Sequence, residues 1–190
     1  TAKDVRWARE KALLANKLGI PILLCADSEG DAADEKDDQE GISGEISKFL
    51  TVMHEVGVPS FSLLHGQGGS GGGLKFMRPL NGAVATSLAF PYVSHPRVQR
   101  KIMWDEWPTA QQEIDFIKTL ADSKPEVLRS FGLIDRVIIE PPGGIQQNPS
   151  QFSKHLRNFL RIALLGTRGW TPQQVRDHKW ERIEKVAHYA

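Results

Sequence analysis

The stretch that decides the fold is the glycine run GQGGSGGG at residues 66–73, which directly follows a short apolar segment at residues 58–64. The apolar segment is rich in large and β-branched side chains, which predicts a buried β-strand. Six of the eight residues in the run are glycine, and glycine permits positive φ angles and close approach of a ligand to the backbone. The run therefore predicts a turn at the carboxyl end of a strand, with free N–H groups that can bind an anion or an oxyanion.

Other glycine-rich motifs fit this run less well. A flexible linker rarely begins at the end of a hydrophobic strand. The GxGxxG spacing that begins at Gly66 matches a dinucleotide-binding fingerprint, but that motif needs an acidic residue about 20 positions later. No Asp or Glu occurs between residues 75 and 104, and Leu74 stands where a Walker phosphate loop requires lysine. An oxyanion-binding turn is the interpretation that remains.

Composition narrows the class of protein. A chain of 190 residues is long enough for one domain with a substantial core. Its 24 basic and 23 acidic residues give no electrostatic reason to expect nucleic acid or a membrane surface as a partner. The single cysteine, Cys25, excludes an internal disulfide and fits a reducing compartment, and no apolar run approaches the roughly 18 residues of a membrane span. We expect a cytoplasmic enzyme or part of one.

One pattern occurs twice in the first third of the chain: an amphipathic helix, a glycine stop and a buried strand. The helices are predicted at residues 3–18 and 43–56, and the phrase LGIP at residues 18–21 returns as VGVP at residues 56–59. This repeat predicts a βαβ unit of a parallel sheet, whose ligand site lies at the carboxyl ends of the strands. The continuous apolar run of the first strand, residues 20–26, predicts burial on both faces, with Cys25 as a packing residue and a nucleophile as the alternative.

The rest of the chain alternates strands and helices. Strands are predicted at residues 82–88 and 133–139, and a short helix at residues 74–78. Three further helices are predicted to begin at capping motifs, which are residues 109–112, 123–126 and 171–174, and one more helix carries Phe152 to Ala163. The last helix is expected to use Val175, Trp180, Ile183 and Ala187 as its apolar face. We predict a core domain at residues 1–148 and a helical extension at residues 149–190.

Several polar segments have two interpretations each. The acidic residues between Asp27 and Glu40 predict a solvated mobile loop, with a metal site as the alternative; the calcium-loop pattern is absent, and no metal site is predicted. Residues 90–101 are expected to be irregular, either an exposed basic loop or a clamp for phosphates. The six histidines are scattered, and His65, next to the glycine run, is the only one considered for a site.

Five motifs occur in a familiar order: LGIP at residues 18–21, GVP at 57–59, the glycine run with Leu74, FGLID at 131–135 and EPPGG at 140–144. With them, the chain resembles the carboxyltransferase α-subunit family of bacterial acetyl-CoA carboxylase, in the crotonase superfamily. The resemblance covers nearly the whole chain. It implies an α/β fold of the ClpP/crotonase type with parallel βαβ units and a helical C-terminus, incomplete without upstream or partner segments.

The resemblance also implies an activity, which is the transfer of a carboxyl group from carboxybiotin on a carrier protein to the α carbon of an acyl-CoA. The product of the acetyl-CoA reaction, malonyl-CoA, feeds fatty acid biosynthesis. In such enzymes backbone amides hold the biotin ureido oxygen, and by motif position these are the amides of Gly72 and Gly73. Substrate contacts are implied for Gly30 and for residues Gly68, Gly69, Ser70 and Gly71. The implied partners are a β-type carboxyltransferase half and a biotin carboxyl carrier protein, in a hetero-oligomer.

Two segments depart from the family pattern. Residues 27–34 read DSEGDAAD where the family has DTPGAYPG, and residues 93–97 read VSHPR where it has ISPEG. The first departure concerns the approach of biotin, and the second concerns acyl-CoA positioning or the partner contact. The alternatives are a biotin-independent crotonase-like acyl-CoA decarboxylase or transferase, and a non-catalytic scaffold that completes a partner's site.

Overall fold

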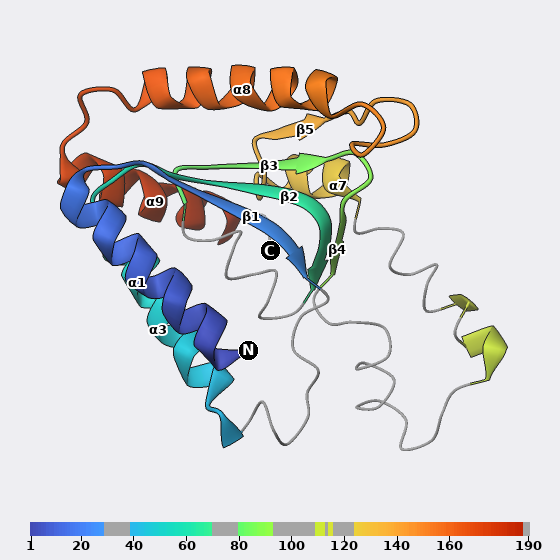
Figure 1. The fold of residues 1–190 in the computed structure, drawn as a ribbon, viewed down its shortest axis with the longest axis horizontal. Helices are drawn as coiled ribbons and strands as arrows, with labels where there is room; N and C mark the ends of the chain where they lie inside the picture. The colour runs from blue at the N-terminus through green and yellow to red at the C-terminus, as the bar shows by residue number, and fades with distance from the viewer. Residues whose placement is uncertain (29–38, 70–79, 93–108, 113, 116–123, 188–190) are drawn as a thin grey trace.

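A parallel β-sheet organises the computed structural model, which describes residues 1–28, 39–69, 80–92, 109–112, 114–115 and 124–187 (Figure 1). Its strands are β1 (Ile22–Ser28), β2 (Ser60–Gly69), β3 (Gly82–Thr86), β4 (Phe90–Tyr92) and β5 (Arg136–Ile138). The order is β1-β2-β3-β5, and β4 pairs with the later part of β2. Every pairing is parallel, so the predicted α/β class with a parallel sheet is confirmed.

The helices are α1 (Ala2–Leu18), α3 (Ile42–Glu55), α7 (Pro125–Ser130), α8 (Pro149–Gly166) and α9 (Pro172–Ala187). Thr1 and Asp4 form a capping box at the start of α1, and Gly19 ends this helix with a φ of 68°. The predicted capping pairs Thr109–Gln112 and Thr171–Gln174 are also formed, with hydrogen bonds in both directions. These two capping predictions are thus confirmed, whereas the N-cap of α7 is Lys124, which makes no side-chain capping hydrogen bond. The predicted helix at residues 74–78 lies outside them.

The predicted βαβ unit is confirmed, since α3 connects β1 to the parallel β2. Ile22 pairs with Ser60, and these two residues are as far apart in sequence as Gly19 and Gly57 of the repeated phrase. The spacing of the repeated phrase therefore matches the register of β1 and β2, and its repetition matches their parallel direction. Figure 1 shows α1 and α3 side by side, and between them and the sheet lies an apolar cluster that includes Phe49, Met53 and Val58.

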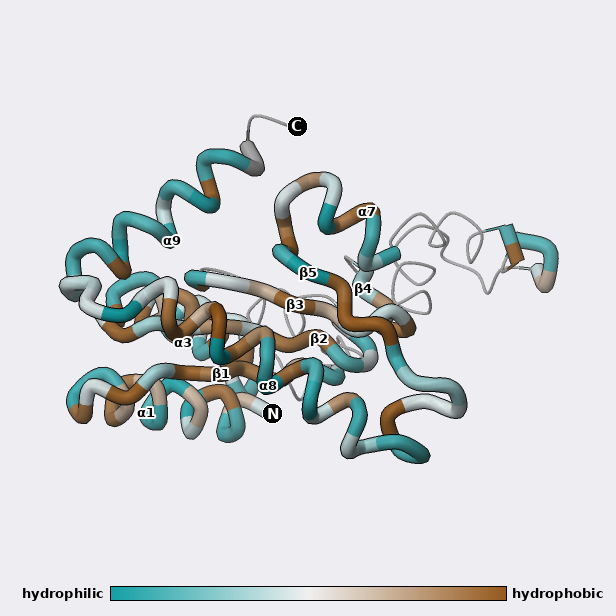
Figure 2. The backbone as a smooth tube through the Cα atoms, turned by 90° about the horizontal axis from the view of Figure 1, so that it is seen from above, coloured by the Kyte–Doolittle hydropathy of each residue, from teal (hydrophilic) through white to brown (hydrophobic). Residues whose placement is uncertain are grey.

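Two helices pack on the sheet further along the chain. Pairing places Leu63, Val84 and Ile138 on a second apolar cluster, where they contact the α8 residues Phe152 and Phe159. A third cluster joins Ala26, Leu64 and Ala85 to Ile134 and to Leu128 of α7. In Figure 2 α9 is mainly hydrophilic along its length, in agreement with the small number of its apolar side chains.

The prediction that the first strand is buried on both faces is wrong for the described structure. Burial alternates along β1: Leu23 and Cys25 are exposed, whereas Leu24 is half-buried. The physical reason is that helices cover the two faces of β1 unequally. Ile22 and Leu24 face the α1–α3 cluster. Cys25 pairs with Leu63 on the other face, where α8 covers the neighbouring strands but not β1. Cys25 is therefore not the fully packed residue that we expected, although partial burial raises the pKa of its thiol.

The predicted apolar face of α9 needs one correction. Trp180 is 53% exposed, and its ring contacts the ring of His54, with 4.8 Å between the centroids. The fully buried side chain next to it is Lys179, with 0% exposure. Val175, Lys179 and Ile183 share one side of the helix because they are four residues apart, so a lysine occupies the centre of the inward stripe.

Candidate functional site

The carboxyl ends of β1, β2 and β4 meet at one edge of the sheet, where Figure 1 shows their arrowheads close together. Ser28, the last residue of β1, pairs with Gly68, and Gly69, the last residue of β2, pairs with Tyr92. We call this region the carboxyl edge: Asp27, Ser28, residues 66–69 and residues 90–92. Ligands in open parallel α/β sheets bind beyond this end of the strands.

The first half of the glycine run is strand, not turn, and this corrects our prediction. β2 continues to Gly69, five residues beyond the predicted end at Leu64. Its partner changes along the way: residues 61–64 pair with β3, whereas residues 67–69 pair with β4. Because neighbouring strands flank these glycines, the backbone stays extended where glycine alone suggests a turn.

Asp27 stabilises β2 at the point where its register with β1 shifts. The register with β1 shifts between Ala26, which pairs with Leu64, and Ser28, which pairs with Gly68. In the shifted segment, Asp27 Oδ1 accepts a hydrogen bond from the Gln67 N–H at 2.9 Å. Asp27 is therefore the end of a strand and a backbone acceptor, whereas we expected it to open the acidic loop. Residues 29–38 of that predicted loop lie outside the described residues.

Two glycines of β2 lie directly against neighbouring side chains. A Cβ atom on Gly66 would lie 2.1 Å from Asp27 Oδ1, and a Cβ atom on Gly68 would lie 2.7 Å from Leu64 Cδ1. Distances this short force a neighbour to move. These glycines thus allow close approach, as expected, but the approaching groups belong to the protein itself.

The third strand of the edge, β4, was predicted to be irregular. Tyr92 is buried, and its hydroxyl donates to Gln67 Oε1 at 2.6 Å, which ties β4 to β2 through side chains as well as through pairing. A second link lies at the ends of β3 and β5, where Ser87 N–H donates to Ile138 O and Glu140 N–H donates to Ser87 Oγ. Arg97, Arg100 and Lys101, the basic residues considered for either an exposed loop or a phosphate clamp, lie outside the described residues.

The predicted site residues divide into two groups. Gly68 and Gly69 lie at the carboxyl edge, within β2. Gly30, Ser70, Gly71, Gly72 and Gly73 lie outside the described residues, but in sequence they directly follow the ends of β1 and β2. His65 is half-buried in β2, at the point where the pairing with β1 shifts.

The opposite edge of the sheet holds a polar network that sequence reasoning missed. Lys179 Nζ donates to the carbonyl oxygens of Met53 and Val56, at 2.9 and 2.8 Å, and so satisfies the end of α3. Burial, with a smaller contribution from Arg176, lowers the pKa of Lys179 to about 8. Asn81 adds a second link, because its side chain accepts from Ser60 N–H and donates to Val175 O. These groups attach α9 to the sheet and are satisfied within the protein, so we assign them a structural role.

The polar side chains Asp27, Gln67 and Tyr92 of the carboxyl edge form hydrogen bonds within the protein. Among the residues described, no three His, Cys, Asp or Glu side chains come together as a metal site would need. None of the described helices has the length and apolarity to cross a membrane.

Comparison with known families agrees with this geometry. A family model described as "Acetyl co-enzyme A carboxylase carboxyltransferase-like" matches residues 2–187. The chain is 31% identical over 178 residues to the acetyl-coenzyme A carboxylase carboxyl transferase subunit alpha of Bordetella avium, covering 94% of this chain and 54% of that protein. It is 29% identical over 180 residues to the same subunit of Cyanidioschyzon merolae, covering 92% and 55%. The chain thus spans about half the length of the curated relatives it matches.

Solved structures share the fold. A Pseudomonas malonate decarboxylase hetero-tetramer in complex with coenzyme A matches with a TM-score of 0.72 and 16% identity, over 97% of this chain and 72% of that one. Transcarboxylase 12S with hydrolyzed methylmalonyl-coenzyme A bound matches with a TM-score of 0.68 and 17% identity, over 86% and 30%. The predicted crotonase-like fold is confirmed by these similarities.

Proposed function

Since the chain belongs to the acetyl-CoA carboxylase carboxyltransferase family, we propose that it is the α-type half of a biotin-dependent acyl-CoA carboxyltransferase. In this proposal it acts with a β-type half in a hetero-oligomer and receives carboxybiotin from a carrier protein. The family match over residues 2–187 is the observation that carries the proposal. The position of the second half of the glycine run, directly after β2 at the carboxyl edge, supports it.

The carboxyl edge leads into backbone N–H groups of the kind that can bind the ureido oxygen of biotin. Asp27 accepts a hydrogen bond from the backbone of Gln67, and Tyr92 donates one to its side chain. Together they hold the final residues of β2 in place. Beyond Gly69 the sequence continues with Ser70 and three glycines, which offer backbone N–H groups and almost no side-chain bulk. Amides of this type are suitable donors to a neutral or negatively charged oxygen.

Carboxybiotin supplies the carboxyl group in this reaction. The chain's own contribution is to hold the biotin ureido oxygen with the N–H groups of Gly72 and Gly73 and so to stabilise the negative charge that develops there. Losing one such donor typically reduces turnover by about 10²–10³, or about 3–4 kcal/mol of transition-state stabilisation. Gly68, Gly69, Ser70, Gly71 and Gly30 are assigned to the walls of the same site, around the bound substrate.

Gly73→Val tests this assignment, because a β-branched side chain beside the amide obstructs an oxygen that must approach it. We expect the turnover of carboxyl transfer to fall by about 10² or more. The assay is the decarboxylation of malonyl-CoA, or of another carboxyacyl-CoA, with biotin as the acceptor, on protein assembled with its β-type partner.

Gly73→Ala is the matched control, since the family that the chain resembles carries alanine at this position, and it should be much milder. Sedimentation verifies that both variants assemble normally. If Gly73→Val assembles and keeps near wild-type turnover, the oxyanion assignment is wrong. Decarboxylation that proceeds equally well without biotin would overturn the proposed biotin dependence instead.

A further inference from the structure

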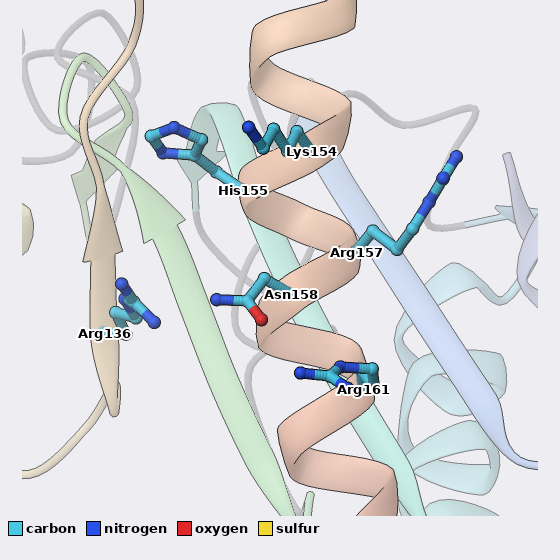
Figure 3. Close-up of a pocket in the computed structure, with 6 residues that line it drawn as sticks. All are labelled: Arg136, Lys154, His155, Arg157, Asn158 and Arg161. Carbon is cyan, nitrogen blue, oxygen red and sulfur yellow. The ribbon is translucent and has the colours of Figure 1, made fainter.

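A groove of about 480 Å³ lies between β5 and α8, at the side of the sheet away from β1. We call it the basic groove, and its lining residues are Arg136, Lys154, His155, Arg157, Asn158 and Arg161. Figure 3 shows Arg136 on β5 and the other residues on α8, with His155 and Asn158 extending from the helix toward β5. A volume of this size is within the range of small-ligand sites.

The fold fixes both walls of the groove. Arg136 pairs with Val84 across β3 and β5, which places it on the sheet face that α8 covers. On α8, Phe152 and Phe159 are buried against that face. Residues Lys154, Arg157, Asn158 and Arg161 are exposed and recur at intervals of three and four along the same helix, so they form a continuous row on its solvent side. The groove is therefore anchored by apolar packing beneath it.

The charge of the groove is uncompensated within the described structure. Four of its six residues are permanently or normally cationic (Arg136, Lys154, Arg157 and Arg161), and none is acidic. Among the described residues, none of the six lining side chains forms a hydrogen bond or an ion pair. α8 itself contains no Asp or Glu. Like charges held together in this way repel one another unless an anion lies between them.

The charge cluster at the other side of the molecule shows how this chain compensates cations elsewhere. Arg9 and Lys48 each lie 3.0 Å from a carboxylate oxygen of Glu45, and Arg6 lies 3.7 Å from it. The hydrogen bond from Lys48 and, to a smaller extent, these ion pairs lower the pKa of Glu45. The basic groove gathers a similar number of cations, but in the described structure no carboxylate lies at their centre.

We propose that the basic groove binds a small phosphorylated molecule that carries two or more phosphate groups, of the nucleoside-diphosphate kind. Three of its four cations are arginine, whose planar guanidinium groups match phosphate with paired hydrogen bonds. The concave shape and volume suit a small ligand, and the row of side chains along α8 suits neighbouring phosphates. This site lies beside β5, on the side of the sheet opposite β1, and does not depend on the carboxyl-transfer proposal.

The test is calorimetric titration of the full chain with inorganic pyrophosphate and with ADP at low ionic strength. We expect saturable binding that weakens with added salt. The double variant Arg157→Gln/Arg161→Gln should weaken pyrophosphate binding at least tenfold. The matched control Lys17→Gln/Arg168→Gln removes the same charge from exposed positions outside the groove and should change binding less than twofold. Circular dichroism verifies that both variants keep the fold.

Three outcomes would overturn the proposal. Absence of saturable binding to the wild-type chain excludes the ligand class. Equal weakening in the groove variant and in the control shows a non-specific effect of net charge. Tighter groove-dependent binding of an acidic peptide or of single-stranded RNA than of pyrophosphate and ADP assigns the groove to a macromolecular partner instead.

Discussion

Residues 60–64 and residues 65–69 form one continuous strand, β2, but they are held in place by different interactions. The first half lies between β1 and β3 and places Leu63 and Leu64 in apolar clusters, at 3% and 1% exposure. The second half has glycine at three of its five positions and exchanges β3 for β4 as its neighbour. It is held by strand pairing and by the side chains of Asp27 and Tyr92.

The two halves of β2 therefore have different roles: the first half stabilises the fold, and the second half positions the backbone next to the site. Apolar burial in the first half stabilises the sheet, because large buried side chains contribute most to folding. The second half contributes less burial, so its exact course depends on hydrogen bonds and on the space that glycine leaves. We therefore expect substitutions in the first half to unfold the protein, and substitutions in the second half to displace the backbone that leads into Ser70–Gly73.

Leu63→Ala should have the largest effect. It removes a buried side chain that contacts the cluster of Val84, Ile138 and α8, so it should lower the free energy of unfolding by about 2–5 kcal/mol. Urea unfolding followed by tryptophan fluorescence measures this change. Leu88→Ala is the matched control, since Leu88 is 70% exposed, and it should stay within about 0.5 kcal/mol of wild type. Similar losses for the two variants would contradict the assignment of stability to the first half.

Gly68→Ala comes next, and it probes the boundary between the halves. Its Cβ would lie 2.7 Å from Cδ1 of the buried Leu64, so the cluster must rearrange, at about 1–3 kcal/mol. Gly44→Ala in α3 is the control, because a Cβ there meets nothing within 4 Å, and it should stabilise the protein by roughly 0.5–1 kcal/mol. The same urea unfolding assay applies. A Gly68→Ala variant as stable as wild type would show that Leu64 has room to move.

The sequence predicted the first half of β2 and its setting, but not the second half. The apolar pattern of residues 58–64 and the repeated glycine–proline phrase indicate a parallel strand pair, and the equal spacing of Gly19–Gly57 and Ile22–Ser60 contains its register. The apolar signal ends where glycine begins. What extends the strand is β4 and the Asp27 carboxylate, which is 40 residues away from Gln67, and no local pattern encodes such a contact.

Lys179 shows the same limit at the other edge of the sheet. A lysine is normally exposed, so α9 was predicted to bury Trp180. The burial of Lys179 depends on carbonyl groups at the end of α3, which only the tertiary structure brings near. The available signal was its spacing, since Lys179 lies four residues from both Val175 and Ile183 on the inward side of the helix.

The smallest expected change in the free energy of unfolding concerns a single pair, Gly66 and Asp27, and so tests one interaction in the second half of β2. A Cβ on Gly66 would lie 2.1 Å from Asp27 Oδ1, but Asp27 is exposed and its carboxylate can move away. Gly66→Ala should therefore cost little more than the hydrogen bond to Gln67 N–H, about 0.5–1.5 kcal/mol, rather than the cost of a core clash. Asp27→Ala removes the same hydrogen bond and should cost a similar amount, whereas Asp27→Asn keeps an acceptor oxygen and should be milder.

The double variant Asp27→Ala/Gly66→Ala follows from this reasoning. If both single changes act by breaking one hydrogen bond, the second change adds almost nothing, and the double-mutant cycle gives a coupling energy close to the cost of either single variant. Urea unfolding of the four proteins measures the cycle, and amide hydrogen exchange at Gln67 reports the bond directly. Additive losses would mean that Gly66 is constrained by something other than Asp27. A coupling energy close to the cost of either single variant would establish that the Asp27 carboxylate at the end of β1 sets the course of β2 through the first half of the glycine run.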